Sequence, residues 1–435
     1  MLHGTAVTQP IHQGEGERGM ATSISSALDR SRAMLPQMIA WRRHIHQHPE
    51  LAMEEYQTSE LVAQVLTGLG LEVLRGPEHT GTPTGVVGIL RGEAAPPGGG
   101  RTIAIRADMD ALPITERTGL PFASRHEGKM HACGHDGHTA ILLGTASILA
   151  EQRRLLPGNV KFIFQPAEET IGGAEPMVKA GVVDDVDVVL ALHLNASQPT
   201  GFISLKYGVA TAAVDTAHIT ILGKNSHGAW PHRGIDAIHT AGQAIVALQA
   251  MVSRQTSALD PLVFTIGTIR GGTASNIVAE EVAMDATIRT LRDETRAAVP
   301  QRIEQILRGV CRAFGAEYRL QITPGYPSVI NDPLVCALVE EAASAVLGPD
   351  RVLLRDEPGM GAEDFAYFGR AVRGCMFNLG ARNEEQGITA LAHTPYFTFD
   401  EEAMAYGAAI FVQAVQQFLA AGLPPEAPKG RLPQA

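Results

Sequence analysis

Residues 131–169 read HACGHDGHTAILLGTASILAEQRRLLPGNVKFIFQPAEE, and this stretch decides how the chain is expected to fold. A loop rich in glycine and histidine (131–138) leads into an apolar segment of helical length (139–149). The mostly apolar segment 160–164 then has the length of a buried strand, and two adjacent glutamates follow it closely. Loop, helix and buried strand in this order are typical of an α/β domain.

The same alternation extends in both directions along the chain. The pattern predicts a helix at 35–69 that Pro49 breaks or kinks, strands at 85–90 and 102–107, a helix at 173–180 and a strand at 186–194. Strands that alternate with helices favour a mostly parallel sheet that helices cover on both faces.

The order of elements changes after Gly208. Strands at 215–222, 262–270, 281–291 and 318–323, with helices at 235–252 and 294–314, give β-α-β-β-α-β, the ferredoxin-like order. Helix–strand alternation then resumes with a helix at 333–347, strands at 352–354 and 376–379, and a helix at 401–420. The sequence therefore predicts a sheet domain in two parts, 25–208 and 324–435, around an inserted α+β domain at 209–323.

Composition narrows the function classes. With 35 Lys and Arg against 46 Asp and Glu, the formal charge is −11, so the overall field disfavours binding to nucleic acid or to an anionic membrane. Four cysteines without a C-x-x-C pair indicate no disulfide framework and fit a reducing compartment.

The two ends of the chain carry little information about function. Residues 1–24 lack the features of a signal peptide, so we expect a cytoplasmic protein; Met20 is an alternative start. Residues 1–24 and 423–435 are expected to be frayed. A G-x-G-x-x-G match at 14–19 has no preceding strand, and P-loop, H-E-x-x-H and G-x-S-x-G motifs are absent, so nucleotide binding and serine hydrolysis lose their usual support.

The histidine-rich loop is the first candidate metal site. Its glycines allow Cys133 and His135 to point at one centre, and a thiolate with an imidazole suits Zn²⁺, Co²⁺ or Ni²⁺ better than Mg²⁺. The alternative is that Cys133 is a small buried side chain and the histidines cap a helix.

Glu168 and Glu169 provide the second signal. Neighbours in extended chain point to opposite sides, so one carboxylate can bind metal while the other faces a substrate. That division suits metal-assisted hydrolysis, in which a carboxylate accepts a proton from water. The alternative, if this segment is taken alone, is that Glu168 and Glu169 are solvated residues of a loop and have no catalytic role.

Two further histidines complete a metal shell. His193 lies near the end of an apolar strand, where it is either a satisfied core residue or a ligand, and His393 could return to the same sheet edge. Cys133, His135, Glu169, His193 and His393 are too many donors for one tetrahedral zinc and suit two metal ions. Asp108 and Asp110 share one face of another strand, where a carboxylate could accept the second N–H of a ligating histidine; the alternative is a turn before Pro113.

The motifs also resemble those of a known family. WRRHIHQHPE (41–50), DMDALP (108–113), HACGHDGH (131–138), QPAEE (165–169) and GAEDFAYF (361–368) resemble, in order, the aminoacylase and carboxypeptidase family of dinuclear metallopeptidases. Within it they resemble the hippurate hydrolases and auxin-conjugate amidohydrolases. The resemblance implies a zinc-exopeptidase-like catalytic domain, an inserted lid and dimerisation domain, a homodimer, and two divalent ions (Zn, Mn, Ni or Co) that serve hydrolysis of N-acyl amino acids.

The resemblance also assigns roles to single residues. Cys133, His135, Glu169, His193 and His393 match the subfamily's metal ligands, and Glu168 matches its general base. Asp108-Met-Asp110 stands where many members of the family have H-x-D, so the usual ligand histidine is missing. Asp110 is therefore a better candidate than Asp108 for the carboxylate that accepts a hydrogen bond from a metal-ligating histidine. His227, in GKNSHG (223–228), matches a histidine that polarises the scissile carbonyl and is expected to act in the partner subunit.

Other assignments stay open at this point. Asn276 and Arg289 resemble groups that hold the amide oxygen or the α-carboxylate of the substrate, although a surface ion pair would also explain Arg289. A dipeptidase or an N-acetyl-diaminopimelate deacetylase would use the same mechanism. A protein that binds metal or a small molecule without turnover is the alternative from a different class.

Overall fold

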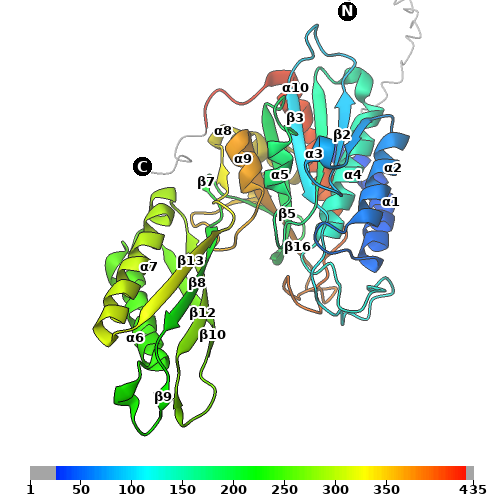
Figure 1. Ribbon diagram of the computed structural model, residues 1–435. Helices are drawn as coiled ribbons and strands as arrows, with labels where there is room; N and C mark the ends of the chain where they lie inside the picture. Colours follow the sequence, from blue (N-terminus) through cyan, green and yellow to red (C-terminus); the bar gives the residue numbers. More distant parts are fainter. Residues whose placement is uncertain (1–25, 428–435) are drawn as a thin grey trace, which may run out of the picture.

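Two large sheets organise the chain in the computed structural model, which describes residues 26–427 (Figure 1). The expectations for residues 1–24, for the 14–19 motif and for the last eight residues therefore lie outside the described residues.

The larger sheet has eight strands in the order β1-β2-β4-β3-β5-β16-β6-β15. Its strands are β1 (Glu72–Arg75), β2 (Val86–Arg91), β3 (Thr102–Asp108), β4 (Asn159–Gln165), β5 (Val188–Pro199), β6 (Ile203–Leu205), β15 (Val352–Leu354) and β16 (Arg373–Arg382). The centre, β4-β3-β5-β16, is parallel, as is the β6–β15 pair, whereas β1, β2 and β6 run antiparallel to an inner neighbour. The expected mostly parallel α/β sheet is confirmed.

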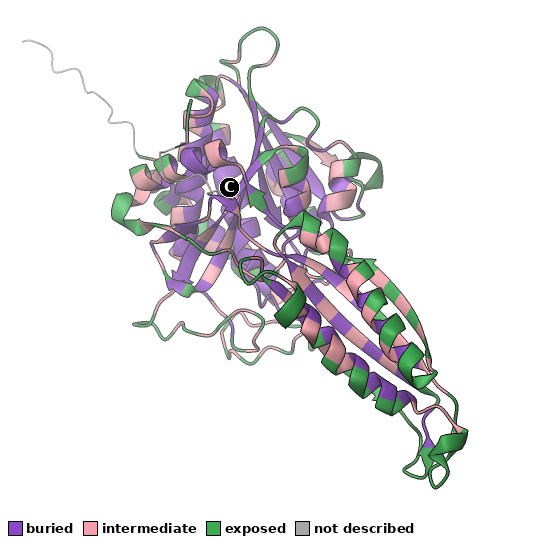
Figure 2. Ribbon diagram, turned by 90° about the vertical axis from the view of Figure 1, so that its left-hand side faces the viewer, coloured by how far each residue is buried: buried purple, intermediate pink, exposed green. Residues whose placement is uncertain are grey.

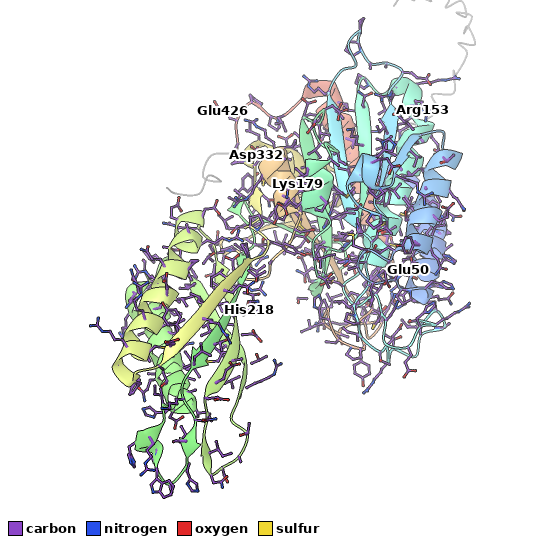
Figure 3. The ribbon with its side chains drawn as sticks, viewed as in Figure 1. Glu50, Arg153, Lys179, His218, Asp332 and Glu426 are labelled. Atoms are coloured by element: carbon purple, nitrogen blue, oxygen red, sulfur yellow. The ribbon has the colours of Figure 1, made fainter. Side chains whose placement is uncertain are left out.

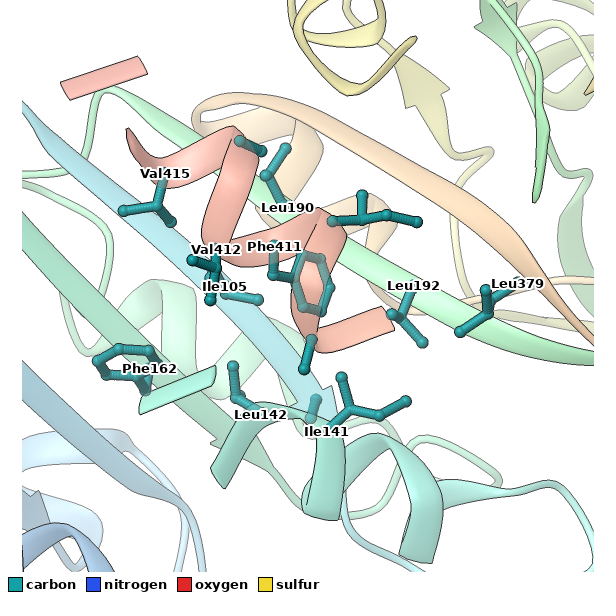
Figure 4. Close-up of a cluster of buried hydrophobic side chains, with 14 of the residues drawn as sticks. Ile105, Ile141, Leu142, Phe162, Leu190, Leu192, Leu379, Phe411, Val412 and Val415 are labelled. Carbon is teal, nitrogen blue, oxygen red and sulfur yellow. The ribbon is translucent and has the colours of Figure 1, made fainter. Parts of the chain in front are cut away.

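Helices cover both faces of this sheet. They are α1 (Ala27–Gln47), α2 (Tyr56–Gly68), α4 (His135–Glu151), α8 (Pro333–Leu347) and α10 (Ala403–Ala421) beside the main core, the short α3 (Pro77–Thr80), and α5 (Ala174–Lys179) and α9 (Ala366–Ala371) beside a smaller core on the other face. Alternate residues of β2 divide between the two cores, as the period of two in a strand requires. Figure 4 shows part of the main core, where Phe411 of α10 lies among side chains of β3, β5 and α4.

The helical segment predicted at 35–69 is divided near Pro49, as expected, although the break is longer than a kink. Two helices form, and the segment between α1 and α2 is not helical. Pro49 has no N–H for a helical bond, and the Glu50 carboxylate accepts hydrogen bonds from Gln57 N (3.0 Å) and Thr58 N (2.9 Å), which caps the start of α2. The short edge strand β1 was not predicted at all.

The smaller sheet belongs to an inserted unit at residues 213–324. Its elements are β8 (Ala213–Leu222), α6 (Ala237–Ala250), β10 (Leu262–Gly271), β12 (Glu281–Thr290), α7 (Asp293–Phe314) and β13 (Glu317–Pro324). The strand order β10-β12-β8-β13 is antiparallel throughout, which is the ferredoxin-like arrangement. The boundaries at 209 and 323, together with the roles given to the parts, stay predictions.

One face of the smaller sheet is apolar and the other is polar. Burial alternates along β8 and β12, whose buried residues pack with α6 and α7 in a separate core (Figure 2). His218, which Figure 3 labels, lies on the polar face. Its Nδ1 lies 2.8 Å from Asp285 Oδ1. The small sheet of β9 (Ser226–His227) and β11 (Ile277–Val278) lies at the end of the unit that is far from the larger sheet (Figure 1).

The two connections between the sheets run side by side. β7 (Gly208–Val209) pairs with β14 (Ile330–Asn331), and Val214 N donates to Tyr326 O at 2.9 Å. The chain therefore enters and leaves the inserted unit through one paired neck.

One described helix, α10, is long and apolar enough to cross a membrane by length and composition alone. Its most apolar window is 72% buried inside the protein, where it packs in the main core. Burial of this kind is what a core helix requires.

Candidate active site

The candidate site lies where parallel strands end. β4, β3 and β5 are adjacent and parallel, so residues that follow them meet at one edge of the sheet. Asp108 is the last residue of β3, Glu168 and Glu169 follow β4 closely, and His193 lies in β5. The sequence-based expectation that these residues converge agrees with the geometry.

The start of α4 brings in the thiol and an imidazole. The helix begins at His135, four residues before the predicted start, so His135 and His138 lie in its first turn and not in a loop. Gly134 makes the turn possible, because its φ of +99° is a conformation that other residues rarely adopt. Cys133, directly before this turn, is 7% exposed and faces the same space.

Five potential ligands surround one small space. Cys133 Sγ lies 3.3 Å from Nε2 of both His193 and His393, and Glu169 Oε1 lies 3.2 Å from His393 Nε2 and 3.8 Å from His135 Nε2. Donors about 2.0–2.3 Å from a tetrahedral ion are separated from one another by about 3.3–3.8 Å. The spacing of the five side chains therefore fits ligands of divalent ions.

Hydrogen bonds leave the metal-facing atoms free. Nδ1 of His135 lies 2.9 Å from Asp110 O, and Nδ1 of His193 lies 2.8 Å from Leu194 O, so each Nδ1 carries the proton and each Nε2 keeps its lone pair. His135 Nε2 and Glu169 Oε1 are buried and make no hydrogen bond among the described residues, and the polar atoms beside Glu169 Oε1 belong to two other potential ligands, His393 and His135. Since buried polar atoms rarely lack a hydrogen bond, the positions of these two atoms fit those of metal ligands.

Asp110 holds the two glutamates in place. Its Oδ1 accepts from Glu168 N and its Oδ2 from Glu169 N, both at 3.0 Å. Its carboxylate lies 3.3 Å from His135 Nδ1, which is farther than the Asp110 backbone oxygen at 2.9 Å, so the backbone oxygen is the main acceptor of this N–H. Asp110 therefore positions the carboxylates more than it orients the histidine.

Asp108 is a buried contact of the site and does not cap a turn. It is fully buried, and Oδ1 lies 2.6 Å from His138 Nδ1 while Oδ2 lies 2.7 Å from Arg106 Nη1. His138 Nε2 in turn accepts from Leu194 N at 2.9 Å. Both nitrogens of His138 are therefore used, which excludes it as a ligand in this arrangement.

Sequence reasoning missed a buried charge cluster beneath Glu168. Arg106 Nη2 donates to Glu363 (2.9 Å) and to Asp364 (2.8 Å), and both carboxylates lie within 4.8 Å of the Glu168 carboxylate. Burial and the neighbouring Glu363 and Asp364 raise the pKa of Glu168 well above its usual value. An arginine inside the otherwise apolar strand TIAIRAD was the available signal, because such a charge needs buried partners.

Three residues of the inserted unit were expected to contact the substrate, and only one of them lines the cavity beside the five potential ligands. Arg289 lines a cavity of about 800 Å³ that also reaches Cys133, Glu168 and His393. Burial lowers the pKa of Arg289, and the surface ion pair considered for it does not form among the described residues. His227 and Asn276 lie next to one another at the far end, where Gly228 N donates to Asn276 O at 2.7 Å, and neither lines this cavity.

Glu55 is a second residue that sequence reasoning missed. It is fully buried, and its Oε1 accepts from Ala167 N (3.0 Å) and Met53 N (3.1 Å) while Thr84 Oγ1 donates to Oε2 (2.6 Å). Ala167 and Met53 have φ of +59° and +62°, a strained conformation for residues with a side chain. Glu55 therefore holds the turn that aims Glu168 and Glu169.

Replacing Glu55 tests this support. Glu55→Ala should lower kcat by about 10- to 100-fold, because small displacements of reacting groups are costly. Glu55→Gln should stay within a few-fold of wild type, since its amide oxygen can accept from both N–H groups and its NH₂ can donate to Thr84. Equal activity of the alanine variant and wild type would contradict the assignment.

The raised pKa of Glu55 also predicts how the stability of the wild type depends on pH, and Glu55→Gln provides the comparison. Burial raises the pKa of Glu55 from 4.5 to about 7, so between these values the folded state binds more protons than the unfolded state. Stability of the wild type should therefore fall as pH rises through this window, by up to about 3 kcal/mol from this group. Glutamine does not titrate, so Glu55→Gln should not lose stability in this way. The difference in the free energy of unfolding between variant and wild type, measured with denaturant, should therefore shift in favour of the variant from pH 5 to pH 8.

The chain is similar in sequence to a known peptidase family and to several characterised hydrolases. Residues 104–417 match the sequence profile of peptidase family M20/M25/M40. The chain is 46% identical over 295 residues to the N-acyl-L-amino acid amidohydrolase of Geobacillus stearothermophilus, covering 68% of this chain and 78% of that protein. It is 40% identical over 374 residues to thermostable carboxypeptidase 1 of Saccharolobus solfataricus, covering 85% and 92%.

A solved structure shows the same architecture. The crystal structure of the Bacillus subtilis YXEP protein, described as a dinuclear metal binding peptidase, matches with a TM-score of 0.77 and 35% identity. The match covers 89% of this chain and 99% of that one, so it includes both the larger sheet and the inserted unit.

Proposed function

The chain belongs to peptidase family M20/M25/M40 and is a hydrolase of that family, and from this premise we propose that it is a two-metal amidohydrolase of N-acyl amino acids. Its products are a carboxylic acid and a free amino acid. One observation carries the proposal: a cage of five potential metal ligands, two of whose buried polar atoms make no hydrogen bond, lies beside Glu168, a carboxylate that is not needed as a ligand.

Cys133, His135, Glu169, His193 and His393 hold the two divalent ions in this proposal. A thiolate and three imidazoles suit Zn, Ni or Co better than hard cations that prefer oxygen ligands, and Mn is a further candidate because of the family resemblance. Bound in such a cage, these ions supply Lewis acidity that polarises an amide carbonyl and makes water more acidic.

The protein's own side chains supply the remaining steps. Glu168 accepts a proton from the attacking water and later delivers it to the leaving nitrogen, while Asp110 fixes the backbone of Glu168. Arg289 binds the α-carboxylate of the substrate across the cavity, and its guanidinium fork matches a carboxylate.

His227 and Asn276 act in the neighbouring subunit of a homodimer. Both lie far from their own cavity, and exposed apolar side chains surround that end and the edge strand β10, namely Trp230, Ile238, Ile269 and Ile277. Pairing this edge with the same edge of a second copy across a two-fold axis would satisfy its unpaired backbone N–H and C=O groups. In that position His227 would stabilise the oxyanion of a substrate that the partner holds.

Mixing two inactive variants tests this arrangement. His227→Ala and Glu168→Gln subunits, exchanged into mixed dimers, should recover up to about half of wild-type activity, because one of the two sites then has both groups intact. If exchange is demonstrated and nothing is recovered, His227 serves its own subunit or has no catalytic role.

The acyl group and the cell compartment belong to the same proposal. We place the protein in the cytoplasm, where its four free cysteines, Cys133 among them, would stay reduced. Hippurate-like, N-acetyl and indole-acetyl amino acids are the proposed substrates.

A substrate screen tests the proposed reaction. Hippurate, N-acetyl amino acids, indole-acetyl amino acids and dipeptides should be offered with Mn²⁺, Co²⁺, Ni²⁺ and Zn²⁺, and release of free amino acid measured. Turnover of acylated amino acids supports the proposal, whereas turnover of dipeptides alone would favour a carboxypeptidase or dipeptidase.

A further inference from the structure

The cavity above the metal cage carries more positive charge than the proposed reaction uses. Cys133, Glu169 and His393 form one part of its wall, and the cations Lys206, Arg289 and Arg355 form another. Arg289 has a proposed role as the α-carboxylate partner. Lys206 and Arg355 have none.

Sheet register places these two cations on the face that carries His193. Strands β5, β16, β6 and β15 are consecutive neighbours, and one row across them joins His193, Asn378, Ser204 and Leu353. Lys206 and Arg355 follow Ser204 and Leu353 by two residues, so they lie on the same face. Arg355 N donates to Leu205 O at 2.8 Å, which extends the β6–β15 ladder as far as Arg355.

The same register fixes their separation from the cage. Neighbouring strands lie about 4.8 Å apart, so β6 and β15 are displaced sideways from β5 by about 10 Å and about 14 Å. Because β6 runs antiparallel to β16, the two cations are also displaced from His193 by two residues along the strands, about 7 Å, away from the carboxyl ends of β5 and β16. Side chains as long as those of lysine and arginine span several ångströms of this gap. Both side chains line the cavity that Cys133 and His193 also line, so an extended substrate in this cavity can bring an acidic group to Lys206 and Arg355.

Neither cation has a carboxylate partner in the described part of the chain. Lys206 Nζ donates to Tyr207 O (2.9 Å), and the guanidinium of Arg355 makes no ion pair, although Asp356 and Glu357 follow it on the same exposed loop. Two like charges at the same register position of adjacent strands raise the positive potential on their side of the cavity. Four carboxylates line the same cavity, but Asp215 pairs with Arg296, Glu363 pairs with Arg106, and Glu168 and Glu169 belong to the proposed reaction site. Lys206 and Arg355 therefore remain available to an anionic ligand.

We propose that Lys206 and Arg355 form a second anion subsite, so that the enzyme prefers N-acyl amino acids that carry a carboxylate in addition to the one bound by Arg289. The inference rests on the proposed amidohydrolase function and specifies its substrate class. The second carboxylate belongs either to an acidic amino-acid side chain or to a dicarboxylic acyl group, because both present the same chemistry to the two cations.

Two matched substrate pairs distinguish these sources. N-acetyl-L-glutamate is compared with N-acetyl-L-glutamine, and N-succinyl-L-leucine with N-pentanoyl-L-leucine. Wild type should prefer the charged member of one pair by about 10- to 100-fold in kcat/KM, the scale of hydrogen bonds to charged groups. The preference should shrink as salt is added, because the subsite is open to solvent.

Variants then assign the preference to the two cations. Lys206→Met with Arg355→Gln should bring the charged-to-neutral ratio close to 1, mainly through KM, and each single change should lower it in part. Lys179→Met and Arg154→Gln, which alter exposed cations outside the cavity, should leave the ratio unchanged. Equal use of both members of both pairs by wild type, or a ratio that survives the double change, would overturn the proposal.

A binding measurement separates this proposal from the amidohydrolase function. Calorimetry with glutarate and with pentanoate needs no turnover, and glutarate should bind the metal-loaded wild type at least about 10-fold more tightly than the double variant. If this holds while none of the four amides is cleaved, the subsite stands and the proposed function fails. If the amides are cleaved but glutarate binds both proteins equally, the subsite fails alone.

Discussion

Replacing Glu168 with glutamine should lower turnover by about 10²–10⁴-fold, the range expected when a general base is lost. Glutamine keeps the size of the side chain and its backbone contact with Asp110, but it cannot accept a proton. Metal content should stay at the wild-type value, since Glu168 is not among the five proposed ligands. Activity on an N-acyl amino acid and metal analysis of the same preparation provide the measurement.

Glu169→Gln is the matched comparison. Glu169 Oε1 is the unpaired buried atom beside His135 and His393, so this change should release metal, and activity should be lost as a consequence. Loss of metal from Glu168→Gln, with retention in Glu169→Gln, would show that the two carboxylates have been assigned the wrong way round. Glu175→Gln, on the surface of α5, should change neither quantity.

Replacing Cys133 with alanine should abolish hydrolysis and reduce bound metal. The sulfur lies 3.3 Å from both His193 Nε2 and His393 Nε2, so it is the donor that joins the two sides of the cage. A thiolate contributes charge as well as a bond, and alanine replaces neither. Metal content per chain and amidase activity should fall together.

The choice of control is important because every described cysteine is buried. Cys311→Ala removes a thiol from the core of the inserted unit, and it should leave metal content unchanged. Cys133→Ala with full activity and unchanged metal content would remove Cys133 from the cage and leave four donors. Oxidants should inactivate the metal-free protein faster than the loaded protein, since bound metal protects the thiolate.

Much of the fold followed from local signals in the sequence. The predicted helix at 333–347 and the strand at 352–354 coincide with α8 and β15, because Asp332 and Pro333 mark the helix start and Gly348 follows its end. The start of α4 was placed too late, since polar site residues occupy its first turn and interrupt the apolar pattern. The break after α1 was underestimated because the Glu50 cap acts across seven and eight residues.

The site divides in the same way. The five donors could be placed together because residues that follow parallel strands converge on one sheet edge. The contacts that support them could not, because Arg106 meets Glu363 and Asp364, and Glu55 meets Ala167, only through tertiary packing. The distance of His227 from its own cavity depends on the orientation of the inserted unit, which periodicity does not encode.

Titration of the metal-stripped protein with a divalent ion tests the central claim most directly. After treatment with a chelator, Mn²⁺ or Zn²⁺ is added stepwise, and release of amino acid from hippurate and from an N-acetyl amino acid is followed against metal bound. The two-metal account predicts no hydrolysis by the stripped protein and activity that reaches its plateau at about two ions per chain. Hydrolysis that persists without metal, or a fully loaded protein that cleaves neither substrate, would contradict it.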